Sequence, residues 1–462
     1  MSTRALARFV AELKYESLPP EVIERARVHL LDGLGCLLAG TKGGPGRSAA
    51  QMVAALHTHG GDATVFTGRT RGSPRDAAFV NAMTLYSVGL NDIHTGSVSH
   101  PGGCVIPTVL AAGEAGNVPG REMLVSMIAG YEVMCRVGRS IMPSHRERGF
   151  HPTGTYGTFG TTAAAARMMG FTADQTANAF GIAGSQAAGL FAFHKDGALT
   201  MVFHAARAAQ NGIEAALLTT TGLTGPFTVL EGKRGFCRAT SDAFDESLLT
   251  RKLGQSYEVM ATSFRPYYGC SSTLAASGCT AALMKRLRIK SPEEVAEVIV
   301  RCHAVVEHDN HEDDPQTLLA ARLSLPFNVS LVIARGDVVT ADLYDEDLRD
   351  RKVRASLKNV RLVRDDTMPR FGCAMTMKLT NGKTAEETIL APRGEADHPL
   401  TWDDVADKFR RLTSAVMRAE GAQPVIDAVR NLETIGPRVL AQRMVEGMKS
   451  QGAGHSTFRD CR

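Results

Sequence analysis

The chain has 462 residues, of which 44% are hydrophobic and 22% are charged. This length is more than one hydrophobic core usually serves, so it predicts two or three domains. Its 52 basic and 48 acidic residues leave a net charge of +4 and are spread along the sequence, so we expect no surface for nucleic acid or an anionic membrane.

Helical patterns run through almost all of the first 264 residues. The first 18 residues predict an amphipathic helix rather than a secretory signal. Pro19 and Pro20 precede an apolar pattern that predicts a helix over 21–40, and Gly40 is a plausible end for it. This region therefore predicts an all-helical start to the fold.

Later helices of this region are rich in Ala and Gly. Thr172 and Gln175 predict a capping box before one helix, and 204–218 predicts another. The most apolar window, 179–193, contains polar residues and predicts a core helix rather than a membrane span. Because small side chains let helix backbones approach closely, we expect a compact helical bundle.

The pattern changes after Pro266. Alternation of apolar and polar residues over 297–308 predicts a strand, and an Asn-Gly pair between the two strand-like runs of 374–390 predicts a hairpin. Helical periodicity returns over 401–417, with Thr401 and Asp404 as its cap.

These patterns predict a mainly α protein with two domains. Residues 1–264 and 398–462 are expected to form a large helical domain built from both ends of the chain. Residues 265–397 are expected to form a smaller α+β domain.

The cysteines are nine in number, scattered, and never in a CxxC pair. An odd, unpatterned set of this kind is typical of reduced thiols, so the sequence predicts a cytoplasmic protein.

Two segments concentrate polar residues beside apolar helices. Residues 90–103 contain Asp92, His94 and His100, and residues 149–160 contain His151. Reactive groups need a rigid support and a partly desolvated setting. We therefore expect the two segments to form one catalytic site, with His100 and His151 lining one cavity.

Several common catalytic motifs are absent. No dinucleotide-binding glycine motif follows a strand, and the sequence has no Walker, GxSxG or HExxH pattern. The glycines of 154–160 recur every three residues, which favours helix packing as their role.

One acidic and histidine-rich stretch raises the question of a metal site. His303, Glu307, His308 and His311 are of ligand type. They follow a predicted strand, where neighbouring side chains point to opposite faces. The sequence therefore favours a solvated connector, and no metal is expected.

Many blocks of the sequence occur in the order seen in one enzyme family. The chain resembles the MmgE/PrpD family, which includes 2-methylcitrate dehydratase, cis-aconitate decarboxylase and iminodisuccinate epimerase. The resemblance implies a large helical domain, a smaller α+β lid domain, a homodimer, and metal-independent, cofactor-free chemistry on small di- or tricarboxylates. The blocks that carry it are 30–40, 77–103, 130–138, 149–171, 180–190, 204–212, 321–336 and 398–412.

At several positions this chain departs from the pattern of the dehydratase and decarboxylase members. Tyr86 and Gly89 replace the first His and the leading Asp of the family loop, and Met201 stands at the family Lys. Burying an unpaired carboxylate against apolar groups is costly, so we expect a substrate with fewer carboxylates or an added hydrophobic group. Apolar residues also stand where members have a Thr, a His and a Tyr, at Ile93, Leu274 and Phe327.

Other positions keep groups suited to the family chemistry. His151 matches the family's second His, and both His151 and His100 are expected to transfer protons, because imidazole titrates near neutrality. Asp92 and His94 are expected to take part, or alternatively to fix the loop. The nearest candidates to replace the missing Lys and Tyr are Lys195, Tyr156, Tyr267 and Tyr268.

Arg265 falls on a basic position of the family. Its guanidinium fork is expected to anchor a substrate carboxylate where the two domains join, and an interdomain salt bridge is the alternative. His204 is expected either near the site or as a core histidine. The remaining expected substrate contacts are Tyr267, Met201, Phe327 and Leu274.

Three functions remain open at this point. The first is a cofactor-independent lyase that dehydrates or decarboxylates a small carboxylate through a carbanion or enolate-like intermediate. The second is an isomerase or epimerase that abstracts a proton beside a carboxylate. The third is a non-enzymatic binding protein on the same scaffold.

Overall fold

A computed structural model describes residues 1–56, 60–339 and 345–450. The contacts within the chain divide it into two compact units. Unit 1 comprises Met1–Ser263 and Thr401–Arg462, and unit 2 comprises Phe264–Leu400. These bounds lie close to the division predicted from the sequence, and the mainly α fold with a small α+β portion is confirmed.

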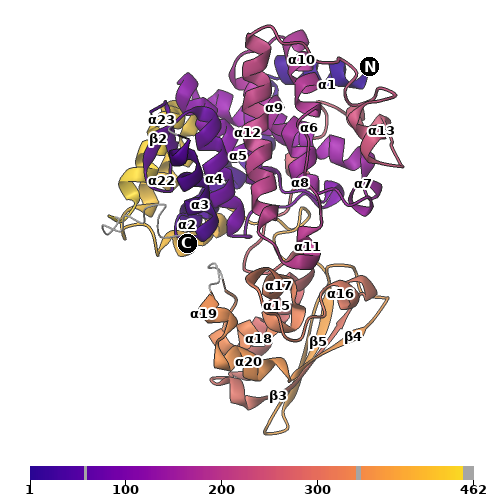
Figure 1. Ribbon diagram of the computed structural model, residues 1–462. Coiled ribbons are helices and arrows are strands. Elements are labelled where there is room, and N and C mark those ends of the chain that lie inside the picture. The colour runs from indigo at the N-terminus through magenta and orange to yellow at the C-terminus, as the bar shows by residue number, and fades with distance from the viewer. Residues whose placement is uncertain (57–59, 340–344, 451–462) are drawn as a thin grey trace. The chain divides into compact units, whose positions relative to one another are not determined.

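Unit 1 is a bundle of helices with one small two-stranded sheet, and Figure 1 shows its C-terminal helices beside the N-terminal ones. Its longer helices are α1 (Ser2–Glu12), α2 (Pro20–Gly40), α3 (Gly44–Ala55), α4 (Pro74–Ser87), α5 (Pro101–Gly116), α6 (Gly120–Ile141), α9 (Gly157–Met168), α10 (Ala173–Gly184), α12 (Thr200–Thr220), α21 (Trp402–Thr413), α22 (Ala422–Arg430) and α23 (Leu432–Gly447). Its short elements are β1 (Ala63–Val65), β2 (Thr70–Gly72), α7 (Ser144–Glu147), α8 (Pro152–Thr155), α11 (Phe193–Asp196), α13 (Phe236–Thr240) and α14 (Ser247–Thr250).

Small residues let the central helices α6, α9 and α12 pack closely. A Cβ atom at Gly160 of α9 would lie 2.6 Å from Met134 Cβ and 2.8 Å from the Gly130 carbonyl oxygen of α6. A Cβ atom at Gly212 of α12 would lie 2.2 Å from Thr161 Oγ1 of α9. A Cβ atom at Gly157 of α9 would lie 3.3 Å from Ala208 Cβ of α12, so the predicted packing role is confirmed for Gly157 and Gly160.

Local sequence correctly predicted two helix starts of unit 1 and the end of α2 at Gly40. The capping box of Thr172 and Gln175 and that of Thr401 and Asp404 both form. The single helix predicted over 179–193 is wrong, because α10 ends at Gly184 and a turn leads to α11. None of the described helices is long and apolar enough to cross a membrane.

Unit 2 packs helices against a four-stranded sheet of order β4-β3-β5-β6, in which only the β3–β4 pair is parallel. Its core includes Leu283 of α15, Val298 and Val300 of β3 and Met377 of β5. The strands are β3 (Val295–Cys302), β4 (Val360–Arg364), β5 (Cys373–Leu379) and β6 (Thr384–Ile389), and the helices are α15 (Ser271–Leu287), α16 (Ala304–Asp309), α17 (Leu318–Leu323), α18 (Leu325–Arg335), α19 (Asp345–Leu348) and α20 (Arg351–Leu357).

The predicted hairpin is confirmed, since β5 and β6 pair in antiparallel register and Gly382 has a φ of 83° in the turn. The strand predicted over 297–308 is wrong in its second half. It ends at Cys302, and the His303 side chain then accepts a hydrogen bond from Val305 N as the cap of α16.

Most of the cysteines are buried. None of the eight within the described ranges forms a disulfide, and seven of those eight are buried. Cys461 lies outside the described residues.

Candidate active site

His100 lies at the start of α5, directly before Pro101 at the first helical position. Its ring Nδ1 is 2.6 Å from the Asp92 carbonyl oxygen, and its ring packs edge to face on Tyr86 at 5.4 Å. A carbonyl oxygen can only accept, so Nδ1 donates and a neutral ring carries its lone pair on Nε2. This tautomer is the one that a general base at Nε2 requires.

Asp92 fixes both the loop and the first turn of α5. Its buried carboxylate accepts from Gly102 N at 3.0 Å and from the Tyr131 hydroxyl at 2.6 Å, and it lies 3.3 Å from His29 Nδ1. Burial would raise the pKa of Asp92, but the hydrogen bonds and charge of His29, with the Tyr131 hydroxyl, hold it below its ordinary value. Asp92 therefore remains an anion and positions His100 through its own backbone carbonyl.

His151 is buried at the start of α8, and its backbone N donates to the Gly189 carbonyl oxygen at 2.9 Å. Its ring Nδ1 lies 3.0 Å from Nδ1 of His204, a residue of α12. Burial lowers the pKa of His151 well below its ordinary value, and positive charge on His204 or His100 would lower it further. His151 is therefore neutral near pH 7.

Glycines make room for this histidine pair. A Cβ atom at Gly154 would lie 2.8 Å from Cβ of His204, and one at Gly189 would lie 3.3 Å from its Cγ. The Gly189 φ of 148° also favours glycine. The pair thus depends on two positions where a side chain does not fit.

Thr153 links the two polar segments predicted from the sequence. Its hydroxyl accepts from His100 N at 3.2 Å and lies 3.4 Å from the Tyr86 hydroxyl. Met201 packs against the small apolar cluster that contains Tyr86. The structure therefore brings together His100, the start of α8 with His151, and the residue that stands at the family Lys.

A cavity of about 690 Å³ adjoins this group. Its lining includes His204 and Phe193, whose rings both contact the His151 ring, and also Arg207 and Asn211. Neither His100 nor His151 is among its lining residues. The prediction that both histidines line one cavity stays a prediction.

His94 is placed differently from His100. Its Nδ1 accepts from Ser97 N at 3.1 Å, and its Nε2 lies 3.0 Å from a Glu258 carboxylate oxygen. Arg139 donates to the other oxygen of Glu258 at 2.6 Å. These contacts favour the loop-fixing alternative for His94, because both ring nitrogens are engaged.

Two other predicted catalytic residues of unit 1 have surroundings that favour other roles. The hydroxyl of Tyr156 donates to the Ser97 carbonyl, and burial raises the pKa of Tyr156 well above its ordinary value. Lys195 is exposed on the short helix α11. A structural hydrogen bond and a solvated charge explain these two residues.

In unit 2, Arg265, Leu274 and Phe327 are buried. The Tyr267 hydroxyl donates to the Leu274 carbonyl oxygen at 2.8 Å, and the Tyr268 hydroxyl donates to the Leu318 carbonyl oxygen at 3.3 Å. The predicted contacts of these residues with substrate stay predictions.

The histidine-rich stretch forms local pairs rather than a converging ligand set. His308 Nδ1 lies 2.9 Å from Asp309, and His311 Nδ1 lies 3.4 Å from Glu307. Within residues 1–56, 60–339 and 345–450, no group of three or more His, Cys, Asp or Glu side chains is arranged to hold a metal ion.

Sequence reasoning missed a buried polar network in unit 1. Lys408 of α21 donates to the Asp32 carboxylate of α2 at 2.6 Å and to the Leu90 carbonyl oxygen at 2.7 Å. Together with His29 and Tyr131, these residues lie around Asp92 and the start of its loop. The side chains of His29, Asp32 and Lys408 are polar and buried, so each requires a buried partner, but no local pattern shows which residues pair.

The chain matches the models of one known protein family over most of its length. The chain matches the MmgE/PrpD N-terminal domain over residues 4–248 and the MmgE/PrpD C-terminal domain over residues 267–434. It belongs to the MmgE/PrpD family, and the resemblance predicted from the sequence is confirmed.

Similar proteins include decarboxylases. A cis-aconitate decarboxylase-like protein of Aspergillus oryzae is 26% identical over 94% of this chain and 94% of its own length. The cis-aconitate decarboxylase of Homo sapiens is 26% identical over 96% and 94%, and that of Aspergillus terreus is 22% identical over 94% and 93%.

Proposed function

We propose that this protein is a cofactor-independent lyase of the dehydratase or decarboxylase type, acting on a small carboxylate through a carbanion or enolate-like intermediate. The observation that carries the proposal is the tautomer imposed on His100, whose Nδ1 donates to the Asp92 carbonyl. The similarity to cis-aconitate decarboxylases over nearly the whole chain supports the reaction class.

The chemistry needs a proton donor or acceptor beside a carboxylate. In decarboxylation, the bond to the departing carboxyl carbon breaks, CO₂ leaves, and the electron pair stays on the remaining carbon until protonated His100 supplies a proton. In dehydration, neutral His100 takes the proton beside the carboxylate, and the hydroxyl group leaves with a proton from a second acid.

His151 and His204 are suited to the role of that second group. A hydrogen bond between their Nδ1 atoms requires one proton on one of the two. Where His204 donates, neutral His151 carries its proton on Nε2 and can donate it. Where His151 donates, its Nε2 is an acceptor. When His151 Nε2 gives up its proton, the bridging proton must pass from His204 to His151 Nδ1, and His204 Nε2 must take up a proton for the pair to stay neutral. His204 lines the cavity of about 690 Å³, from which that proton can come.

An epimerase is the second candidate, favoured by this same arrangement. Two imidazoles from separate segments, His100 and His151, provide one base to remove a proton and one acid to return it. A lyase needs only one proton transfer to or from the reacting carbon atom, whereas an epimerase needs two. The similarity to decarboxylases ranks the lyase first.

The test is mass spectrometry of cis-aconitate and a panel of dicarboxylates incubated with the protein in deuterated water. Loss of CO₂ or water supports the lyase. Uptake of deuterium without mass loss identifies the epimerase, and no change in any substrate favours a binding protein.

Two variants tie the result to the site. His100→Gln is expected to reduce turnover at least about a hundredfold, since a positioned acid or base contributes about 10²- to 10⁴-fold to the reaction rate. His308→Gln changes an exposed histidine and is the matched control. Equal turnover by both variants would remove His100 from the mechanism.

A further inference from the structure

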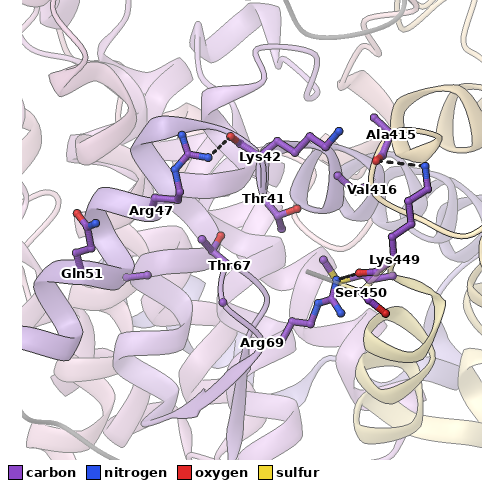
Figure 2. A pocket seen from close by; sticks show the side chains of 13 residues that line it. Thr41, Lys42, Arg47, Gln51, Thr67, Arg69, Ala415, Val416, Lys449 and Ser450 are labelled. Carbon is purple, nitrogen blue, oxygen red and sulfur yellow. Dashed lines mark hydrogen bonds between the residues drawn. The ribbon is translucent and has the colours of Figure 1, made fainter. Parts of the chain in front are cut away.

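Unit 1 contains a second cavity, of about 560 Å³, built by three separate parts of the chain (Figure 2). Thr41 and Lys42 follow α2, and Arg47 and Gln51 lie on α3. The turn between β1 and β2 adds Thr67, Gly68 and Arg69, and the C-terminal segments add Ala415, Val416, Met448, Lys449 and Ser450. None of these residues belongs to the candidate active site.

The lining of this cavity is strongly cationic. It includes Lys42, Arg47, Arg69 and Lys449 but no Asp or Glu. Among the described residues, none of these four cations forms an ion pair with a carboxylate, whereas many other arginines of the chain do. Four like charges around one cavity raise the local positive potential and attract anions.

Backbone carbonyl groups accept hydrogen bonds from three of these four cations. Arg47 donates to the Lys42 carbonyl oxygen at 2.6 Å, and Lys449 Nζ donates to the Ser414 carbonyl oxygen at 2.9 Å. Arg69 donates to the Lys449 carbonyl, which joins the β1–β2 turn to the end of the described chain. Neutral partners restrain the side chains without cancelling their charge.

The backbone at Arg69 supports a specific role for this side chain. Its φ is 51°, in the left-handed region that disfavours residues other than glycine. Strained positions of this kind persist where the surrounding structure requires them and occur often at ligand sites. The buried Nε of Arg69 also has no hydrogen-bond partner within the described part of the chain.

We propose that this cavity binds a small metabolite that carries two or more phosphate groups. Two guanidinium and two ammonium groups match the charge of a di- or triphosphate, and guanidinium forks pair with phosphate oxygens in bidentate fashion. The volume lies within the usual range of small-molecule sites. A nucleic acid fits less well, since the four cations gather around one hollow instead of forming an extended stripe.

The apolar part of the lining indicates that the ligand is larger than a bare phosphate. Ala50, Ala415, Val416 and Met448 provide a surface on which an uncharged part of the ligand can rest. This predicts that a nucleoside diphosphate binds more tightly than inorganic pyrophosphate, and that both bind more tightly than citrate.

Isothermal titration calorimetry of the full chain with ADP, pyrophosphate and citrate tests the proposal. ADP is expected to bind with one-to-one stoichiometry and with an affinity that falls as salt concentration rises. Binding of citrate as tight as that of ADP, or no binding of ADP and pyrophosphate, would overturn the proposal.

Variants assign the binding to this cavity. Arg47→Gln and Lys42→Gln are each expected to weaken ADP binding by roughly tenfold, because each removes a charge-assisted contact. Arg8→Gln removes an exposed arginine outside the cavity and is expected to change nothing. His100→Gln is expected to bind ADP as the unchanged protein does, and loss of binding there would place the ligand in the candidate active site instead.

Discussion

His151 and His204 approach each other with their Nδ1 atoms 3.0 Å apart, although they lie on different helices and 53 positions apart in the sequence. Burial lowers the pKa of both rings. The pair is therefore neutral at physiological pH and shares a single hydrogen between the two Nδ1 atoms.

This pair predicts how stability depends on pH. The folded state holds the pKa of His151 well below its ordinary value of 6.5. Below about pH 6.5 the unfolded chain takes up a proton that the folded chain does not, so the free energy of unfolding falls as pH falls. Each such group contributes up to about 1.4 kcal/mol per pH unit.

His151→Gln removes this contribution. Its free energy of unfolding is expected to vary less between about pH 8 and about pH 5 than that of the unchanged protein, as measured by urea titration. Comparison of the two proteins cancels the other titrating groups. An unchanged pH slope in His151→Gln, alongside the His308→Gln control, would contradict the assignment.

Asp92→Asn is expected to reduce both stability and turnover. The amide keeps the shape of the side chain, but it replaces one of the two carboxylate oxygens with an NH₂ group. Gly102 N and the Tyr131 hydroxyl each donate to a different oxygen of Asp92, so one of them loses its acceptor. We expect a loss of about 1–3 kcal/mol in the free energy of unfolding, since a buried donor is left unsatisfied. Turnover is expected to fall because the loop that orients His100 loosens; full turnover with lowered stability would refute the positioning role.

Lys408→Met is expected to be strongly destabilising. It leaves the Asp32 carboxylate buried without its ammonium partner, and breaking a buried pair in this way costs about 3–5 kcal/mol. The double variant Asp32→Asn with Lys408→Met is expected to recover part of the loss, because no buried charge then remains. Additive losses in denaturant unfolding would show that the two side chains do not interact.

Met201→Lys tests the preference for a less charged substrate. Met201 packs beside the Tyr86 cluster, so a lysine there would add a cation near His100. We expect the ratio of kcat/KM for tricarboxylates to that for monocarboxylates to rise by roughly tenfold, the effect of one charge-assisted hydrogen bond. A matched Met83→Lys variant, which alters the same cluster on another helix, should not reproduce the change.

The parts of the fold that depend on neighbouring residues were predictable from the sequence. Capping boxes and the Asn-Gly hairpin are local patterns, and each forms as expected. The error over 303–308 is also local in origin. A short apolar run suits a strand or a helix, and capping by His303 decides for the helix.

The missed features depend on contacts between distant residues. No periodicity indicates that Asp32 meets Lys408, or that His204 turns toward His151. Likewise, the sequence shows Tyr156 as a polar group near a histidine, but only the structure shows that its hydroxyl donates a hydrogen bond to the Ser97 carbonyl oxygen. The sequence thus identified polar segments, but it did not show which side chains contact one another.

The Asp32–Lys408 pair also constrains the order of events during synthesis. These residues are 376 positions apart, and all of unit 2 is made between them. When α2 has been synthesised, the Asp32 carboxylate therefore lacks the Lys408 ammonium group with which it pairs in the folded protein, and burying it unpaired would be costly. The N-terminal helices cannot reach their final packing until α21 leaves the ribosome, so the nascent chain exposes an unfinished apolar face throughout the translation of unit 2. Chaperone binding to ribosome-bound chains should accordingly end only after residue 413 has emerged.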